Sequence, residues 1–219
     1  MIVRILLLFL ATYASCSGNP ENTIIQLPDR EQDSGITLVE AIDQRRSIRI
    51  FTKDSITLPE LVRILHSAQG ITSERGFRAA PSAGATYPLS VFVIAENVDG
   101  LEPGIYRFHP RENSLMTVRT GNFLHDLALA ALGQRCISSA PVAIAIVADY
   151  SITTSVYGDR GVMYVHMEAG HVSQNIYLQC TAIELGTVAI GAFTDNTVAE
   201  VLGLEENETP LYIMPVGRP

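Results

Sequence analysis

A single helical pattern over residues 160–185 is the strongest constraint on what this chain can fold into. The segment contains no proline, and one face carries apolar side chains at steps of three and four: Val162, Val165, Ala169, Val172, Ile176 and Ile183. A second face adds Met163, Met167, Gly170 and Tyr177. A helix that is apolar on two faces must bury both of them. We therefore expect this helix to lie at the centre of the fold or against a second subunit.

The other elements follow from capping motifs and apolar runs. Thr37–Glu40 and Thr57–Glu60 each match a capping box, in which a threonine and a glutamate satisfy the first amides of a helix. The further elements that we expect are a helix ending at Gly70, strands over 91–95 and 142–148, a hairpin of 105–109 with 115–118, a helix over 123–132, a strand over 188–191, a helix over 195–203 and a strand over 211–216. This order predicts an α+β fold with a mostly antiparallel central sheet flanked by helices.

The N-terminus has the pattern of an export leader. Arg4 precedes an apolar run that ends at Ala11, and small residues surround Cys16. The expected organisation is a leader over 1–16, a polar tether over 17–35 and one domain over 36–219. The protein is then periplasmic, extracellular or anchored to a membrane through a lipid on Cys16. If the first residues form a buried helix or strand instead, the protein is cytoplasmic.

Basic residues gather at one point of an acidic chain. The net charge is −8, with only 15 Lys and Arg, and this balance disfavours nucleic acid as a partner. Arg45, Arg46 and Arg49 nevertheless fall within five positions, with Ser47 between them. Arginines complement the end of a helix, but their forked donors also suit a phosphate group. The run alone leaves a solvated helix end and an anion site both open.

Several other kinds of chemistry lack a motif. The chain has no G-x-S-x-G nucleophile motif and no glycine-rich phosphate loop. His166 and His171 are five positions apart on the expected long helix, so they point in different directions and do not share a metal ion. Cys136 and Cys180 lie in apolar surroundings, which fits either a disulfide or two free buried thiols. No metal site is predicted.

Two segments carry almost no side-chain bulk. Pro81, Ser82, Ala83 and Gly84 belong to a loop bounded by a second proline at position 88, and Gly191–Ala192 follow an expected strand. Backbone of this kind can approach a flat ring closely and offer its amides as donors. The alternative for each is a tightly packed turn.

Taken together, these motifs resemble the nitroreductase superfamily of FMN enzymes. The resemblance is strongest to the branch of SagB-type dehydrogenases, also called McbC-like oxidoreductases, and it covers residues 37–219 in order. The motifs that carry it are Arg45-Arg46-Ser47-Ile48-Arg49-Ile50-Phe51, Gly70-Ile71-Thr72, Pro81-Ser82-Ala83-Gly84-Ala85-Thr86-Tyr87-Pro88, Pro103-Gly104-Ile105-Tyr106, Tyr157-Gly158-Asp159-Arg160-Gly161, Glu168-Ala169-Gly170-His171-Val172-Ser173-Gln174-Asn175, Gly191-Ala192-Phe193 and Pro215-Val216-Gly217-Arg218-Pro219.

The resemblance implies a nitroreductase-like fold and a homodimer with two FMN sites at the interface, each built from both chains. The long helix would lie at the dimer interface. By position, the residues implied at the FMN phosphate and ribityl chain are Arg45, Ser47 and Arg49, with Arg46 beside them and Arg218 as a further phosphate ligand. The loop of Pro81, Ser82, Ala83 and Gly84 would lie along the flavin ring of the partner subunit, and the amides of Gly191 and Ala192 would lie near flavin N5.

One departure from the branch bears on the reaction. Members that oxidise azoline rings carry an adjacent Lys-Tyr pair, and this chain has Val156-Tyr157 there. Tyr157 is the one side chain that we expect to act as an acid or base. The expected function is FMN-dependent hydride transfer to or from a small organic substrate, with NAD(P)H as the reductant. The alternatives are a SagB-type azoline dehydrogenase and a non-catalytic flavin-binding lipoprotein.

Overall fold

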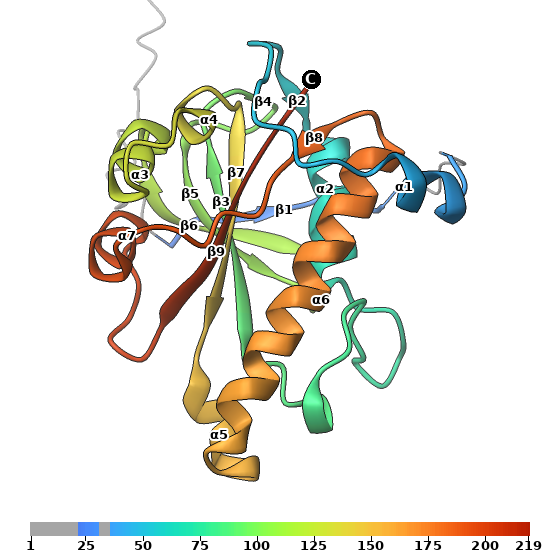
Figure 1. Cartoon of the computed structure of the whole chain (residues 1–219), viewed down its shortest axis with the longest axis vertical. Helices are drawn as coiled ribbons and strands as arrows, with labels where there is room; N and C mark the ends of the chain where they lie inside the picture. Colours follow the sequence, from blue (N-terminus) through green and yellow to red (C-terminus); the bar gives the residue numbers. More distant parts are fainter. Residues whose placement is uncertain (1–21, 31–35) are drawn as a thin grey trace, which may run out of the picture.

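The structure, a computed structural model of the chain, describes residues 22–30 and 36–219. Its core is a seven-stranded sheet in the order β1-β6-β5-β3-β7-β9-β8 (Figure 1), and all its neighbouring strands run antiparallel. The strands are β1 (Ile24–Gln26), β3 (Leu89–Ala95), β5 (Gly104–His109), β6 (Ser114–Thr120), β7 (Val142–Ala148), β8 (Gly186–Thr187) and β9 (Thr209–Gly217). A separate parallel pair joins β2 (Ile56–Thr57) and β4 (Val98–Asp99). The predicted antiparallel central sheet is confirmed.

Helices cover both faces of this sheet (Figure 1). Alternate residues of β3 show the two layers, because Val91 and Val93 pack with α2 and α6, whereas Phe92 and Ile94 pack with α3, α4 and α7. The helices are α1 (Leu38–Gln44), α2 (Leu58–Gln69), α3 (Leu124–Ala130), α4 (Arg135–Ser138), α5 (Tyr150–Tyr157), α6 (Arg160–Ala182) and α7 (Asp195–Leu202), with a 3-10 turn at Ala83–Ala85. The prediction of an α+β fold is confirmed.

Both predicted capping boxes form. The Thr37 hydroxyl accepts the Glu40 N–H, and the Glu40 carboxylate accepts the Thr37 N–H at 2.8 Å. Thr57 and Glu60 make the same reciprocal pair, with the Thr57 N–H 2.8 Å from Glu60 Oε2. These bonds satisfy amides that have no partner inside the helix, and so they define where α1 and α2 begin.

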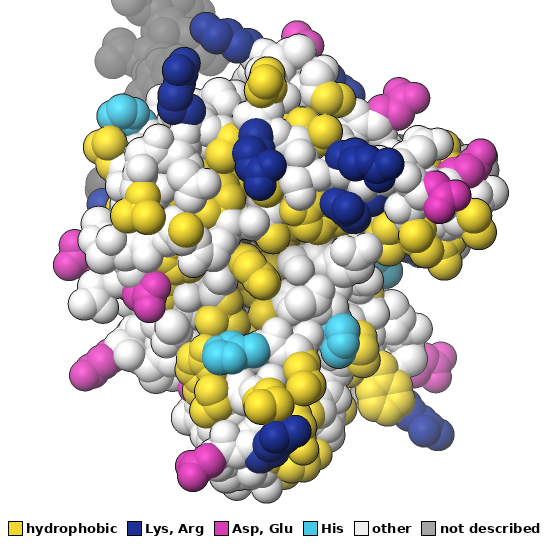
Figure 2. All heavy atoms as spheres, viewed as in Figure 1, with side chains coloured by type: hydrophobic (Ala, Val, Ile, Leu, Met, Phe, Trp, Pro, Cys, Tyr) yellow, Lys and Arg dark blue, Asp and Glu magenta, His cyan; other side chains and the backbone are white. Residues whose placement is uncertain are grey.

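The long helix α6 buries one of its two apolar faces within the chain. Val165, Ala169, Val172 and Ile176 are at most 2% exposed and pack in the core on the sheet. The second face stays open, because Met163 and Met167 are 43% and 50% exposed, and Val162, at the start of the first face, is also 40% exposed. Figure 2 shows hydrophobic side chains on the surface at the end of the molecule formed by α5 and the start of α6. The predicted central helix is therefore half buried by its own chain.

The structure corrects three details of the predicted elements. The strand expected over 188–191 is short and earlier, at Gly186–Thr187, because the Ala189 N–H bonds to the Tyr177 hydroxyl instead of a strand. Ile24–Gln26 lies inside the predicted tether but pairs with β6 as the edge strand β1. The helices α4 and α5 were not predicted.

The predicted leader over 1–16, including Cys16, lies outside the described residues, and so does the rest of the tether outside 22–30. Among the helices that the structure does describe, none has the length and apolar character needed to cross a membrane.

The central strand β7 provides a test of the core. Ile144 is fully buried between β3 and β9, so we expect Ile144→Ala to lower the free energy of unfolding by about 3 kcal/mol, the sum of lost burial and a residual cavity. Urea unfolding followed by circular dichroism measures this change. Leu129→Ala is the control, because Leu129 is 61% exposed on α3 and should change the stability by less than about 0.5 kcal/mol. Equal losses in the two variants would contradict this packing.

Candidate functional site

The arginine run, Arg45 to Arg49, follows α1 directly as an extended segment that contacts α6. Arg45 is the C-cap of α1, and its guanidinium lies 5.2 Å from the centre of the Tyr177 ring. Ser47 Oγ is 3.1 Å from the Tyr177 Oη, and Ser47 also bridges to Thr187 beside β9. The Tyr177 hydroxyl in turn accepts the Ala189 N–H at 2.8 Å. Tyr177 therefore connects the arginine run to the segment that leads to Gly191.

The individual arginines differ in what they bind. Arg46 donates to the backbone oxygens of Asp43 and Arg45 at 2.9 and 2.7 Å, which is the helix-end role that the sequence left open. Arg49 is exposed, and in residues 22–30 and 36–219 no carboxylate pairs with it. Figure 2 shows basic side chains gathered on this face beside α1. Cationic side chains without carboxylate partners are suited to an external anion.

Arg218 is held by an acidic side chain of α2. Its Nη2 lies 2.9 and 3.1 Å from the two carboxylate oxygens of Glu60. Burial opposes the ionisation of Glu60, but hydrogen bonds from Thr57 and Arg218 outweigh it and lower the pKa of this carboxyl. The carboxylate of Glu60 therefore orients Arg218 at the C-terminal end of β9 through a single nitrogen.

Gly191 and Ala192 lie just beyond a two-way backbone bridge. Ile190 and Ile213 exchange N–H···O bonds of 2.9 Å in both directions, and this fixes the start of the segment. The Ala192 carbonyl accepts Gln134 Nε2 at 3.0 Å. Within the described part of the chain, the N–H groups of Gly191 and Ala192 have no hydrogen-bond partner, and both residues are exposed. Two adjacent donors are thus presented outward.

The loop at Pro81 to Gly84 contacts Tyr157. Gly84 has φ = 59° in a 3-10 turn, and a Cβ at this position would lie only 2.5 Å from the Tyr157 Oη. The Ser82 Oγ accepts the Tyr87 N–H at 2.9 Å, which holds the loop in a tight turn. Only glycine combines this φ with such a close approach. The structure therefore brings Tyr157 and the predicted ring-binding loop together.

This loop and α6 form a hollow of about 270 Å³. Its lining residues are Pro81, Ser82, Ala83, Tyr164, Met167, Glu168 and His171. The lining is mainly apolar, and its one acidic side chain is Glu168. The hollow has the size and character of part of a binding site for a flat organic group.

Glu168 is the most unusual side chain here. It is 2% exposed, and its Oε1 is buried without a hydrogen-bond partner in the described residues. Burial raises the pKa of this carboxyl, and this effect outweighs the Ser82 hydroxyl, the Gln69 amide and the charge of Arg78, which favour the anion. The carboxyl is thus biased towards its neutral, protonated form.

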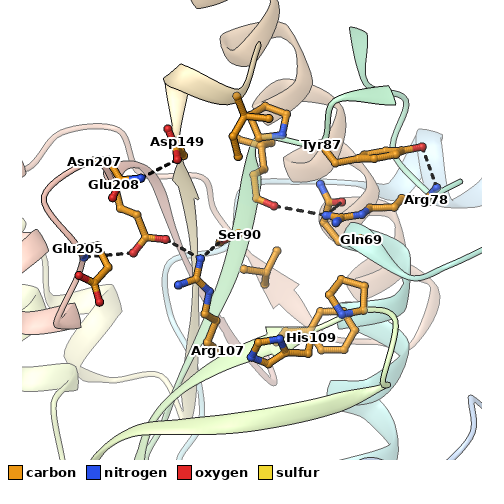
Figure 3. Close-up of a pocket in the computed structure, with 16 residues that line it drawn as sticks. Gln69, Arg78, Tyr87, Ser90, Arg107, His109, Asp149, Glu205, Asn207 and Glu208 are labelled. Atoms are coloured by element: carbon orange, nitrogen blue, oxygen red, sulfur yellow. Dashed lines mark hydrogen bonds and ion pairs between the residues drawn. The ribbon is translucent and has the colours of Figure 1, made fainter. Parts of the chain in front are cut away.

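A larger cleft of about 400 Å³ lies elsewhere and contains none of the predicted site residues. Figure 3 shows that Arg107 pairs with Glu208 and that Asp149 and Arg78 bind the neutral side chains of Asn207 and Gln69. Arg107 Nη2 is 2.6 Å from Glu208 Oε1, and Asn207 Nδ2 is 2.6 Å from Asp149 Oδ2. These contacts tie the loop before β9 to β5 and to the end of β7. They give Arg107, Glu208, Asp149 and Asn207 a structural role.

Most of the predicted site residues fall into two groups that contact α6, whereas Arg218 is held by Glu60 of α2 and Arg49 is exposed. Arg45, Ser47 and the 189–192 segment meet at Tyr177, and the 81–84 loop lies at Glu168. These two α6 residues are nine positions apart, or about 13 Å along the helix axis. A single chain does not close these groups around one ligand.

Neither Tyr177 nor Glu168 is recognisable as a site residue from the sequence. The sequence places Tyr177 only on an apolar helix face, because nothing in the pattern reveals which polar groups its hydroxyl contacts. Glu168 did carry a signal, since it is an acid between Val165 and Ala169 on the buried face of a helix.

Metals and disulfides contribute no further site in the parts that the structure describes. Residues 22–30 and 36–219 contain no group of three His, Cys, Asp or Glu side chains able to hold a metal ion. Cys136 and Cys180 are free and buried, which decides between the two alternatives for this pair. His166 Nε2 lies 2.6 Å from the Tyr150 Oη, so this histidine has a side-chain partner.

The antiparallel sheet and the long helix α6 define a nitroreductase-like fold. The chain belongs to the nitroreductase family, whose model matches residues 42–218. It is 50% identical over 194 residues to the Methanocaldococcus jannaschii protein named "Putative nitroreductase MJ1384", covering 89% of this chain and 96% of that one.

Two further comparisons concern the fold and a more distant relative. A crystal structure of a nitroreductase-like protein from Ralstonia eutropha superposes with a TM-score of 0.79 at 27% identity, covering 92% of this chain and 91% of that one. The microcin B17-processing protein McbC of Escherichia coli is 27% identical over 146 residues. That match covers 64% of this chain and 54% of McbC, so this chain matches about half of the McbC length. The predicted nitroreductase-like fold and the family resemblance are confirmed.

The contact between Gly84 and Tyr157 can be tested by substitution. We expect Gly84→Ala to lower the free energy of unfolding by about 2–4 kcal/mol, because a left-handed φ and a steric overlap act together. Gly100→Ala is the matched control, since its φ is +85° but no atom lies within 4 Å of the added Cβ. It should lose only about 1–2 kcal/mol. Equal losses at the two glycines, measured by urea unfolding, would rule out the overlap with Tyr157.

Proposed function

We propose that this protein is an FMN-dependent oxidoreductase that transfers hydride between a reductant and a small organic acceptor. The observation that carries the proposal is the connection made by Tyr177. It joins Arg45 and Ser47, at an exposed basic surface, to the segment that presents the free amides of Gly191 and Ala192.

The basic end suits the FMN phosphate. A flavin phosphate carries about −1.5 to −2 charges, which two or three arginines balance. Arg45 and Arg49 would bind it with the Ser47 hydroxyl, and no carboxylate of the described residues is paired with either arginine. Arg218 can join them with its nitrogens that do not bind Glu60, while Arg46 stabilises the end of α1.

The end of the site that contains Gly191 and Ala192 suits the flavin ring. Gly191 and Ala192 offer two backbone donors without side chains that would block a flat group, and such donors favour negative charge on a reduced ring. When bound, FMN supplies the hydride chemistry. The protein binds and orients it and excludes water from it. NAD(P)H is the reductant that we propose, and nitro compounds and quinones are acceptors that need no dedicated catalytic side chain.

The proposed enzyme is a homodimer. The open face of α6 and the exposed Ile152 and Val156 of α5 form an apolar surface that is unusual for a monomer. A second copy placed there would bring its 81–84 loop to the Gly191 end of the first chain. Each site would then contain both groups of residues, and Tyr157 would be available as an acid or base.

Azoline oxidation is the second candidate, and the similarity to McbC favours it. The chain has Val156 beside Tyr157 where azoline-oxidising members carry lysine, and Val156 is 61% exposed. We therefore rank this reaction below the reduction of nitro compounds or quinones. Oxygen consumption with a thiazoline peptide and no nicotinamide would reverse the ranking. A protein that binds FMN but turns over neither class of substrate would instead support a non-catalytic flavin-binding lipoprotein.

The phosphate assignment predicts the effect of removing the arginines. We expect Arg45→Ala and Arg49→Ala each to weaken FMN binding by about tenfold or more, since each loses a charge-assisted hydrogen bond. FMN titration followed by flavin fluorescence measures the affinity, and circular dichroism checks the fold. Arg111→Ala, on the exposed turn between β5 and β6, should bind FMN like the original protein. Unchanged affinity in both arginine variants would overturn the assignment, and a protein that never binds FMN would overturn the proposed function.

The dimer can be tested on α6. We expect Met163→Glu to shift the protein from dimer to monomer in sedimentation velocity, because a charge would be buried against a second apolar surface. The same variant should lose FMN, as each site would lose its second chain. Leu129→Glu on α3 is the control and should stay dimeric. A Met163→Glu protein that remains a dimer with FMN bound would contradict this interface.

A further inference from the structure

Glu168 is the only acidic or basic residue among the buried polar side chains of the described residues. An isolated carboxylate in such a place costs several kcal/mol, whereas a neutral carboxylic acid costs far less. Residues with this property and no structural ion pair are candidates for a role in the chemistry of the pocket that they line. The surroundings of Glu168 decide between a structural and a functional role.

The nearest cation does not form an ion pair with Glu168. Arg78 Nη1 donates to Gln69 Oε1 at 3.0 Å, and the guanidinium lies 4.6 Å from the centre of the Tyr87 ring. Figure 3 shows Gln69 beside Arg78, with the Tyr87 hydroxyl accepting the Arg78 backbone N–H. Arg78 is thus oriented by neutral partners. Its charge acts on Glu168 only at a distance, and it does not compensate the burial of a carboxylate.

Ser82 carries the hydroxyl next to Glu168 in this hollow. Ser82 Oγ accepts the Tyr87 N–H at 2.9 Å, so its own hydrogen is left to donate. Ser82 lines the same hollow as Glu168, between Pro81 and Ala83. A proton that leaves the Ser82 hydroxyl towards the hollow can therefore be replaced from the neighbouring Glu168 carboxyl.

We propose that Glu168 is the proton store of the flavin pocket, a positioning residue that acts through Ser82. This inference rests on the proposed function. An acceptor that takes a hydride gains two electrons and one proton, and it needs one more proton to become neutral. Ser82 Oγ–H supplies that proton, the carboxylic acid of Glu168 restores the hydroxyl, and the Glu168 carboxylate takes a proton from solvent once the product leaves.

The protonation state is tested first, without flavin. We expect the infrared carbonyl band of the Glu168 carboxylic acid to persist in the flavin-free protein to a higher pH than the bands of exposed carboxyls, and we expect Glu168→Gln to lose it. Glu200→Gln, which removes an exposed carboxyl on α7, should keep the band. A raised pKa also means that Glu168 stabilises the fold fully below its unfolded pKa near 4.5 and that this contribution is lost as the pH rises through the folded value. Glu168→Gln should remove this part of the pH dependence of urea unfolding.

The proton step is tested with FMN bound. The flavin is reduced with one equivalent of dithionite and mixed with para-benzoquinone, and its reoxidation is followed by absorbance. We expect Glu168→Gln and Ser82→Ala each to slow this step by about 10²-fold, with no further loss in the double variant, because the two groups act in series. The pH dependence of the step should also disappear in Glu168→Gln. Glu200→Gln should behave like the original protein.

The outcomes separate this inference from the proposed function. If FMN binds but the infrared band is absent, or if both variants reoxidise at the original rate, the inference fails and the proposed function stands. If FMN does not bind, both fail. Should Glu168→Gln not fold, Ser82→Ala decides, since an unchanged rate and pH profile in that variant would overturn the relay.

Discussion

The burial of one face of α6 on the central sheet is the interaction on which the rest of the structure depends. Val165, Val172 and Ile176 anchor the helix against β3 and β7, and the site residues are attached to the helix at two points. Tyr177 holds the arginine run and the Gly191 segment, and Glu168 lies behind the 81–84 loop. Because both points belong to one packed helix, their separation is fixed by helix geometry and not by flexible loops.

Sequence reasoning succeeded where local chemistry decides the structure. The capping boxes at Thr37 and Thr57 and the continuous apolar run of β7 depend on neighbours in the chain or on simple burial, and all three formed as predicted. It failed over 188–191, where the Ala189 amide bonds to Tyr177 from a distant helix. Ile24–Gln26 was missed for the same reason, since only pairing with β6 makes a strand of so short a segment.

In the candidate site, too, the sequence predicts what depends on neighbouring residues and misses what depends on tertiary contacts. Motifs along the chain identified the arginine run and the two segments without bulky side chains, but they could not reveal how each arginine is used. The structure gives Arg46 a helix-capping role, Arg218 a carboxylate partner and Arg49 an exposed position. The motif that contains Glu168 was recognised, yet the electrostatic environment of its carboxyl depends on Gln69 and Arg78, which lie 99 and 90 positions away. Electrostatic environment is a tertiary property, and composition does not encode it.

The nine-position spacing between Glu168 and Tyr177 also limits how this protein can change over generations. Each residue added to or removed from α6 in that stretch turns everything beyond it by about 100° and shifts it by about 1.5 Å. Such a change would move the Tyr177 hydroxyl away from Ser47 and Ala189, whatever residue was inserted. The exposed side of this stretch should therefore accept many substitutions, whereas its length should stay constant. Related proteins that keep this arrangement would share the length of the stretch more than its residues.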